Sequence, residues 1–192
     1  MKKEVIKEII KHSPFTFIAS ILAVVFVIVL NIQQKNISEN TFEILHPLHI
    51  FASAITTSAI YYKYKKNISN AILIGITGAI FIGSLSDILF PFLGGNMLNL
   101  QISFHLPIIE KPIMILSASF FGALIGIKTK ITEFPHTMHV FLSIFASLFY
   151  ILAFTSIITT TQLLIMGVIV FLAVLIPCCI SDIIYPLLFI KK

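Results

Sequence analysis

The sequence predicts an all-α integral membrane protein, a six-helix bundle built from two inverted three-helix repeats. Only 11% of the residues are charged and the mean hydropathy is +1.04, whereas a soluble domain carries about 25% charged residues. Six apolar stretches occur along the chain, and two motifs occur twice in the same order. We expect one membrane domain over residues 1–192, with repeat one at about 14–93 and repeat two at about 112–190.

The six apolar stretches are the predicted membrane spans. Most approximate the ~20 residues that a helix needs to cross the hydrocarbon core. None alternates polar and apolar residues with the period of two that indicates a strand, and a helix satisfies its own backbone in lipid. The stretches cover residues 14–32, 44–62, 71–93, 112–127, 136–158 and 163–190.

The stretches differ in length and in the placement of their prolines. The first follows four lysines and is too long for the core of a signal peptide, so we expect a retained helix. The fourth is short, whereas the sixth is long and is expected to tilt or break near Pro177. Pro47 and Pro135 suit the first turns of the second and fifth helices, which places the nearby glutamates before the regular helix.

The lysines predict the orientation, because cytoplasmic segments of membrane proteins carry an excess of basic residues. With the N-terminus inside, eleven of the thirteen lysines fall in cytoplasmic segments, and only Lys35 and Lys111 fall outside. We therefore expect a multi-pass protein of the cell (inner) membrane with cytoplasmic N- and C-termini and the lipid bilayer as its partner. Because the lysines lie in short clusters between apolar runs, they indicate topology and no nucleic-acid binding.

Two motifs recur, once in each half of the chain. Residues 43–53 and 133–143 both read E-x-x-H-x-x-H-[IV]-F-x-S, and residues 86–91 and 181–186 both read S-D-I-[LI]-[FY]-P. The first motif lies at the start of the second and fifth spans, and the second motif lies near the end of the third and sixth spans. Since each unit contains an odd number of spans, the second unit is inverted relative to the first, as in many transporters.

Together the motifs supply histidines and carboxylates, which are ligands for a divalent metal ion such as zinc, manganese or iron. Residues at i, i+3 and i+6 share about 120° of a helix surface, and the next antiparallel helix returns its aspartate beside them. The inverted repeat predicts one cluster near the outer surface and one near the cytoplasm. The predicted ligands are Glu43, His46, His49, Asp87, Glu133, His136, His139 and Asp182.

Other interpretations of these residues stay open. A histidine near a helix end can be an interfacial residue, and the Ser-Asp pairs before Pro91 and Pro186 can be helix terminators. Ser53 and Ser143 are interpreted as small residues at helix contacts. The loop after the third span adds the further candidates His105 and Glu110 to the outer cluster, with an ordinary interfacial loop as the alternative.

The repeated arrangement of a histidine near a helix start and an aspartate near a proline resembles the YdjM-like family of predicted membrane-bound metal-dependent hydrolases. The matching stretches run from His49 to Pro91 and from His139 to Pro186, under half of the chain. This chain contains no Arg and lacks the paired aspartates of that family. The resemblance implies that His49 and Asp87 are metal ligands, and it leaves catalytic residues unknown.

The sequence therefore favours a transporter or permease for a divalent cation, with a membrane-embedded metal-dependent hydrolase as the alternative. The inverted repeat supports transport, although ligands near the two interfaces differ from the midplane sites of such proteins. Haem binding would need two histidines facing each other at one depth, and a scaffold role leaves the buried charges unexplained. We expect a small cation or small substrate as ligand, and homo-oligomer formation stays open.

Overall fold

A computed structural model describes residues 10, 14, 17–19, 21–30, 38–131, 133–179 and 184–190. Within these ranges the chain is helical and contains no strand, only an isolated bridge between Ile102 and Thr155, which confirms the all-α class. An apolar helix over Phe17–Leu30 comes first. The elements after it are α2 (Glu39–Tyr64), α3 (Ile68–Ser84), the π-helix η1 (Leu85–Leu89), α4 (Phe90–Met97), α5 (Pro107–Glu110), α6 (Pro112–Thr129), α7 (Glu133–Phe154), α8 (Thr160–Cys179) and α9 (Tyr185–Leu188).

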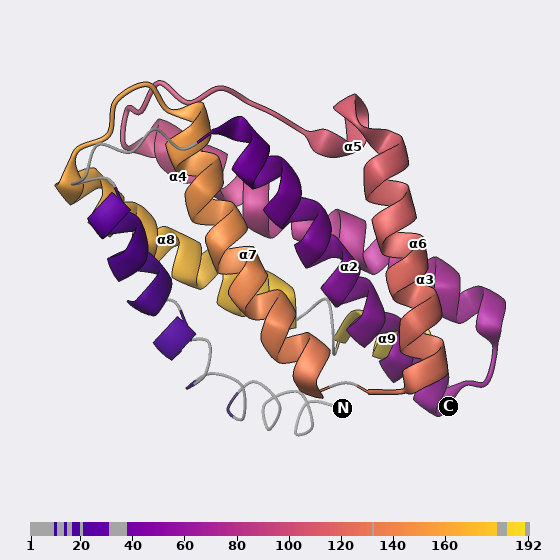
Figure 1. Cartoon of the computed structure of the whole chain (residues 1–192). Helices are drawn as coiled ribbons and strands as arrows, with labels where there is room; N and C mark the ends of the chain where they lie inside the picture. The colour runs from indigo at the N-terminus through magenta and orange to yellow at the C-terminus, as the bar shows by residue number, and fades with distance from the viewer. Residues whose placement is uncertain are drawn as a thin grey trace.

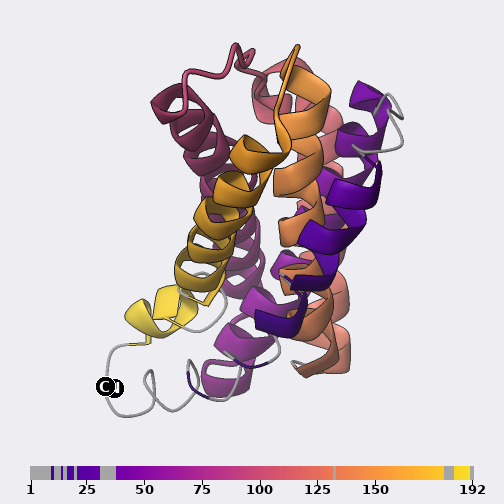
Figure 2. The same cartoon turned by 90° about the vertical axis from the view of Figure 1, so that its left-hand side faces the viewer.

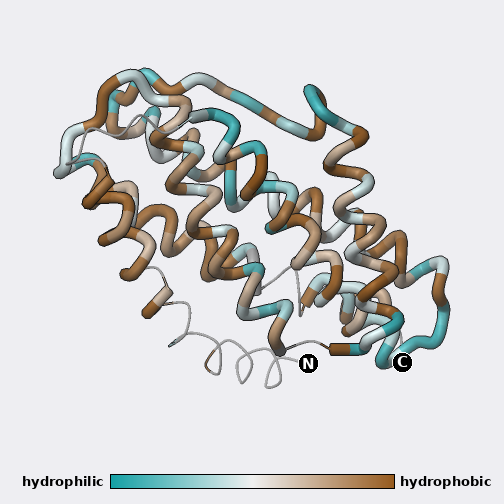
Figure 3. The backbone as a smooth tube through the Cα atoms, in the orientation of Figure 1, coloured by the Kyte–Doolittle hydropathy of each residue, from teal (hydrophilic) through white to brown (hydrophobic). Residues whose placement is uncertain are grey.

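Four helices in the described part of the chain are long and apolar enough to cross a membrane. They cover Ile68–Met97, Pro112–Thr129, Phe134–Phe154 and Thr160–Pro177. These four match the third, fourth, fifth and sixth predicted stretches, whereas the first corresponds to a shorter apolar helix, Phe17–Leu30. Hydrophobic residues dominate the long helices, and hydrophilic residues gather in the connections at the two ends of the bundle (Figure 3).

The second predicted stretch corresponds to α2, a helix of 26 residues with many buried polar side chains. It begins at Glu39, earlier than predicted, because Ser38 serves as its N-cap and accepts a hydrogen bond from the Asn40 N–H at 3.2 Å. Pro47 therefore lies inside the helix, and the prediction that it occupies the first turn is wrong. The sixth stretch contains α8, which continues through Pro177 to Cys179, and α9.

α2 lies at the centre of the bundle and packs against α3, α6 and α7 (Figure 1). It runs antiparallel to α7, because the ring of Phe42 contacts Phe154 near the end of α7 and the ring of His49 contacts His139 near its start. The helices from α3 through α4 and α8 lie together on one side of this pair (Figure 2). Side chains of α2 and α7 can therefore meet in the interior of the bundle.

Glycines allow α6 to approach α2 closely. A Cβ added at Gly126 would overlap the carbonyl oxygen of Ile55 and the hydroxyl of Ser58, and one added at Gly122 would overlap the carbonyl oxygen of Phe51. The Ser58 hydroxyl also donates to the carbonyl oxygen of Ala123 at 3.0 Å. Such close backbone approach through small residues is typical of helix contacts in membranes.

We expect Gly126→Ala to lower the unfolding temperature of the purified protein by about 4 °C or more, because overpacking a tight contact costs about 1–3 kcal/mol. The midpoint can be measured by size-exclusion chromatography of heated, detergent-solubilised samples. Gly95→Ala is the matched control, since the nearest atom to its added Cβ lies 3.3 Å away on the Ile102 side chain. Equal midpoints for the two variants would contradict the close contact between α2 and α6.

Candidate metal centre

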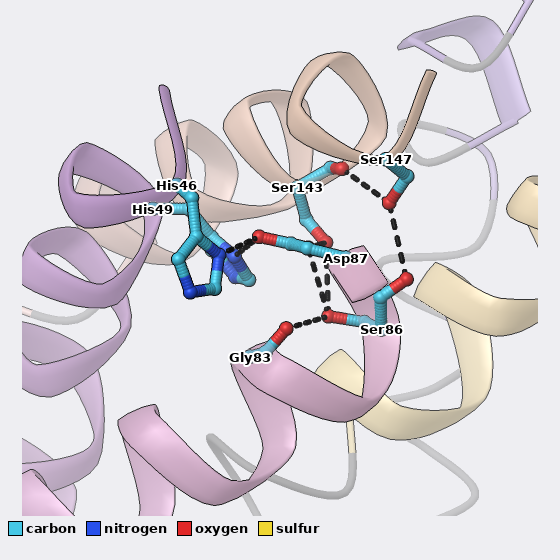
Figure 4. A network of polar contacts seen from close by, with 7 residues as sticks. All are labelled: His46, His49, Gly83, Ser86, Asp87, Ser143 and Ser147. Atoms are coloured by element: carbon cyan, nitrogen blue, oxygen red, sulfur yellow. Dashed lines mark hydrogen bonds and ion pairs between the residues drawn. The ribbon is translucent and has the colours of Figure 1, made fainter. Parts of the chain in front are cut away.

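Asp87 lies in the π-helix η1, where the third predicted span departs from a regular α-helix. The Phe90 N–H donates to the Leu85 carbonyl, five residues earlier. Pro91 has no N–H to offer the Asp87 carbonyl, so an α-helical hydrogen bond is absent at this place. Isolated π-turns within α-helices are frequent at functional sites. The Asp87 side chain is fully buried and lies between α2 and α7 (Figure 4).

Two histidines of α2 converge on one oxygen of this carboxylate. Asp87 Oδ2 lies 2.8 Å from His46 Nδ1 and 2.6 Å from His49 Nδ1. Both histidines are buried, and their spacing of three residues places them on one face of α2. With Asp87 ionised, each Nδ1–H donates to the carboxylate, and the short distances are those of charge-assisted hydrogen bonds. This buried group of His46, His49 and Asp87 could bind a metal ion.

The other carboxylate oxygen connects Asp87 to α7. Asp87 Oδ1 accepts from the Ser86 hydroxyl at 3.0 Å and lies 2.7 Å from the Ser143 hydroxyl. The Ser147 hydroxyl donates to the carbonyl oxygen of Ser86 at 3.1 Å, or to that of Ser143 at 2.7 Å. The two oxygens of one carboxylate therefore contact side chains of two different helices (Figure 4).

These serines show what sequence reasoning missed. The sequence predicts a small packing residue at Ser143, but its hydroxyl contacts the central carboxylate. Its position in the repeated motif was the signal that could have indicated this role. Ser86 belongs to the second motif, whereas Ser147 lies outside both motifs and carries no comparable signal.

The histidines of the second repeat lie beside this group, in contact through their rings. The rings of His49 and His139 stack with their centroids 5.4 Å apart and their planes 11° from parallel. The His136 ring lies 4.9 Å from that of His139, and both side chains are buried. The prediction of one histidine cluster beneath each membrane surface is therefore wrong.

The length of α2 explains this difference in depth. The apolar stretch that starts at residue 44 predicts His46 and His49 in the first turns of its helix. Because α2 begins at Glu39, His49 lies ten residues into the helix, a rise of about 15 Å. His139 lies six residues into the antiparallel α7. Both motifs therefore lie within their antiparallel helices, and the His49 and His139 side chains meet inside the bundle.

The structure does not bring every predicted ligand into this cluster. The Glu43 carboxylate pairs with Lys111 Nζ at 2.5 Å, and both side chains are partly exposed. His105 pairs with Glu110 at 2.8 Å, and Phe42 lies between His105 and His46. Glu133 begins α7, but its side chain lies outside the described part of the structure, as does the whole of Asp182.

Comparison of this chain with protein-family models, with curated proteins and with solved structures finds no match.

Proposed function

We propose that this chain transports a divalent transition-metal cation, which binds in the middle of the bundle to imidazole nitrogens of α2 and α7. One observation carries the proposal. His46 Nδ1 is hydrogen-bonded to the Asp87 carboxylate. His46 Nε2 is buried and has no hydrogen-bond partner among the residues that the structure describes. A buried polar atom without a partner costs about 1–3 kcal/mol, and a bound cation would remove that cost.

The proposed ligands are His46 Nε2 and the imidazoles of His49, His136 and His139. Asp87 orients the two α2 histidines through their Nδ1 atoms, as carboxylates commonly do behind metal-bound histidines. An imidazole-rich set suits zinc, iron and related first-row ions. The negative charge of Asp87 also offsets part of the charge of the cation in a buried place.

The depth of the cluster supports transport. His49 lies ten residues from the start of α2 and fifteen from its end, which are rises of about 15 and 22 Å. Transporters commonly bind their substrate near the midplane of the membrane, at the interface of two repeats. His46, His49, Asp87, His136 and His139 are each at most 3% exposed. Such an enclosure suits a single ion better than a bulky substrate.

We further propose that the chain has six spans, arranged as two inverted three-span repeats with both termini in the cytoplasm. The first two spans would then be Phe17–Leu30 and α2. The antiparallel helices α2 and α7 contain the same motif, and the two motifs bring His49 and His139 together, which supports an inverted relation between the repeats. Movement of one repeat against the other would open the cluster to each side of the membrane in turn.

A membrane-embedded metal-dependent hydrolase is the second candidate. The resemblance to the YdjM-like family assigns His49 and Asp87 to a metal site, and these two side chains are in contact. Hydrolysis would need an open position on the metal for water and a carboxylate base. Asp87 is the described carboxylate nearest to the histidines, but both its oxygens are engaged in hydrogen bonds.

The proposal is tested by zinc flux into proteoliposomes that contain a zinc-sensitive dye, together with zinc binding to the purified protein. We expect wild-type protein to bind zinc and conduct it, and His46→Ala to lower flux and high-affinity binding by at least about tenfold. Bound zinc without flux, together with cleavage of a lipid or peptide bond, would support the hydrolase instead. An absence of both zinc binding and flux would contradict a metal-binding function.

Glu43→Gln is the matched control on α2. It removes a charge one turn before His46, but the Glu43 carboxylate contacts Lys111 and not the histidine cluster. We expect zinc binding and flux within about twofold of wild type, since exposed ion pairs contribute only about 0–1 kcal/mol. A loss as large as that of His46→Ala would instead place Glu43 among the ligands.

A further inference from the structure

A polar pocket of about 310 Å³ lies at the end of the bundle where α2 begins and α7 ends. The lysine distribution predicts that this end faces away from the cytoplasm. Glu39 on the first turn of α2, Ser103 and His105 line the pocket, with Thr155 and Ser156 following α7. The pocket therefore places a carboxylate and an imidazole at this end of the bundle.

His105 is held in this pocket by contacts on three sides. Its Nδ1 lies 2.8 Å from Glu110 Oε2, and its backbone N–H donates to the Tyr150 hydroxyl at 3.4 Å. Its ring stacks on Phe154 with the centroids 4.6 Å apart. The pairing of Nδ1 with a carboxylate repeats the arrangement of His46 and His49 with Asp87, which leaves Nε2 as the nitrogen with ligand character.

Two polar atoms of residues that line this pocket lack an internal partner. His105 Nε2 and Thr155 Oγ1 are both buried, and neither has a hydrogen-bond partner in the described ranges. Such atoms are rare in folded proteins, and a bound ion or water commonly completes their interactions. A third atom of this kind, His46 Nε2, belongs to the central cluster.

Phe42 separates the two histidines. Its ring stacks on that of His46 at 5.4 Å between centroids and meets that of His105 edge to face at 6.0 Å. Phe42 is fully buried, and the rings of Tyr150 and Phe154 surround it at 5.2 and 5.7 Å. These three aromatic side chains form a layer between the polar pocket and the central cluster.

We infer that His105 and Glu39 form a second, weaker site for the same cation, from which it passes Phe42 to reach the central histidines. This inference rests on the proposed function and adds to it the entry route. Glu110 is a positioning residue that fixes the His105 ring. A site of lower affinity at the entrance suits conduction, since an ion must bind in order to enter and still be able to leave.

The test is titration of the full-length protein in lipid nanodiscs with zinc, by equilibrium dialysis against a competing chelator. We expect wild type to bind two zinc ions, one tightly and one weakly. His105→Gln should remove the weak event and leave the tight one, whereas His46→Ala should do the reverse. A single zinc ion in wild type, lost in His46→Ala and kept in His105→Gln, would overturn the second site and leave the proposed function intact. No binding in wild type would overturn both.

Two further variants separate a binding role from a structural one. Glu39→Gln changes an exposed side chain at a helix start and should also weaken the second event, by about tenfold. Glu110→Gln keeps an oxygen for the Leu106 N–H, to which Glu110 Oε1 lies at 3.3 Å, but replaces the partner of His105 Nδ1. We expect the zinc affinity of the second site to fall about tenfold in Glu110→Gln, while the unfolding temperature of this variant stays unchanged. An unchanged weak affinity in both variants would overturn the inferred site.

In flux measurements, His105→Gln should raise the zinc concentration for half-maximal rate by about tenfold, with a change of less than about twofold in the maximal rate. This pattern is expected of a residue that captures the cation before the central site. A fall in the maximal rate with an unchanged half-maximal concentration would assign His105 to a later step and overturn its role in entry.

Discussion

Replacing His139 by alanine is expected to abolish the same high-affinity zinc binding that His49→Ala abolishes. The two rings stack at 5.4 Å although they belong to different halves of the chain. If both imidazoles hold one ion, loss of either should cost more than the roughly 10–100-fold that loss of a supporting residue costs. The measurement is equilibrium dialysis with zinc at several concentrations of a competing chelator.

The double variant distinguishes one site from two. Two residues that hold the same ion are coupled, so the affinity of His49→Ala/His139→Ala should fall far less than the product of the single losses. If the histidines formed two independent sites, each single variant would lose one of two bound zinc ions. The loss of flux in the double variant would then equal the product of the losses in the single variants. Leu48→Ala and Met138→Ala are the controls, because these neighbours of the histidines are 45% and 38% exposed on the outside of the same helices.

The second large effect concerns Asp87. We expect Asp87→Ala to lose both zinc binding and stability, because it leaves buried partners on α2 and α7 without their acceptor, at about 1–3 kcal/mol for each group. Its unfolding temperature should fall by about 4 °C or more. Heated samples analysed by size-exclusion chromatography give the midpoint.

Asp87→Asn separates these two consequences. The amide keeps the shape of the side chain, its oxygen can still accept from Ser143, and its nitrogen can donate to the ring of His46. His46 Nδ1 would then accept, so its proton would move to Nε2, which could no longer bind a cation. We therefore expect near-normal stability with zinc affinity reduced by about 100-fold. Zinc binding like that of wild type would show that Asp87 does not fix the histidines as proposed.

The long apolar helices could be predicted from the sequence because their hydropathy is a local property. α6 begins at Pro112 as predicted and ends two residues after the predicted boundary at 127. The repeated motifs likewise identified the histidines and Asp87, since ionisable residues in a chain this apolar are costly and concentrated. The candidate cluster of His46, His49 and Asp87 follows from that pattern.

The depth of the motif residues within the bundle and their contact partners could not be predicted from the sequence. Both depend on where the helices begin and on which helices are neighbours. Ser38 extends α2 by several residues through a single capping hydrogen bond, and this moves His49 into the interior. Glu43 follows the same motif spacing, yet Lys111 from a distant part of the chain lies beside it. The π-helix around Asp87 also has no clear sequence pattern apart from the nearby Pro91.

The division of Asp87 between two helices constrains how this protein can change shape. One carboxylate oxygen belongs to the histidines of α2 and the other faces Ser143 of α7. Since hydrogen bonds weaken steeply when they lengthen or bend, α2 cannot slide along α7 by an ångström or two while both sets persist. When α2 and α7 slide past each other, the hydrogen bonds of Asp87 to one of these helices must break while those to the other persist. The helix that keeps its hydrogen bonds to Asp87 then moves together with η1.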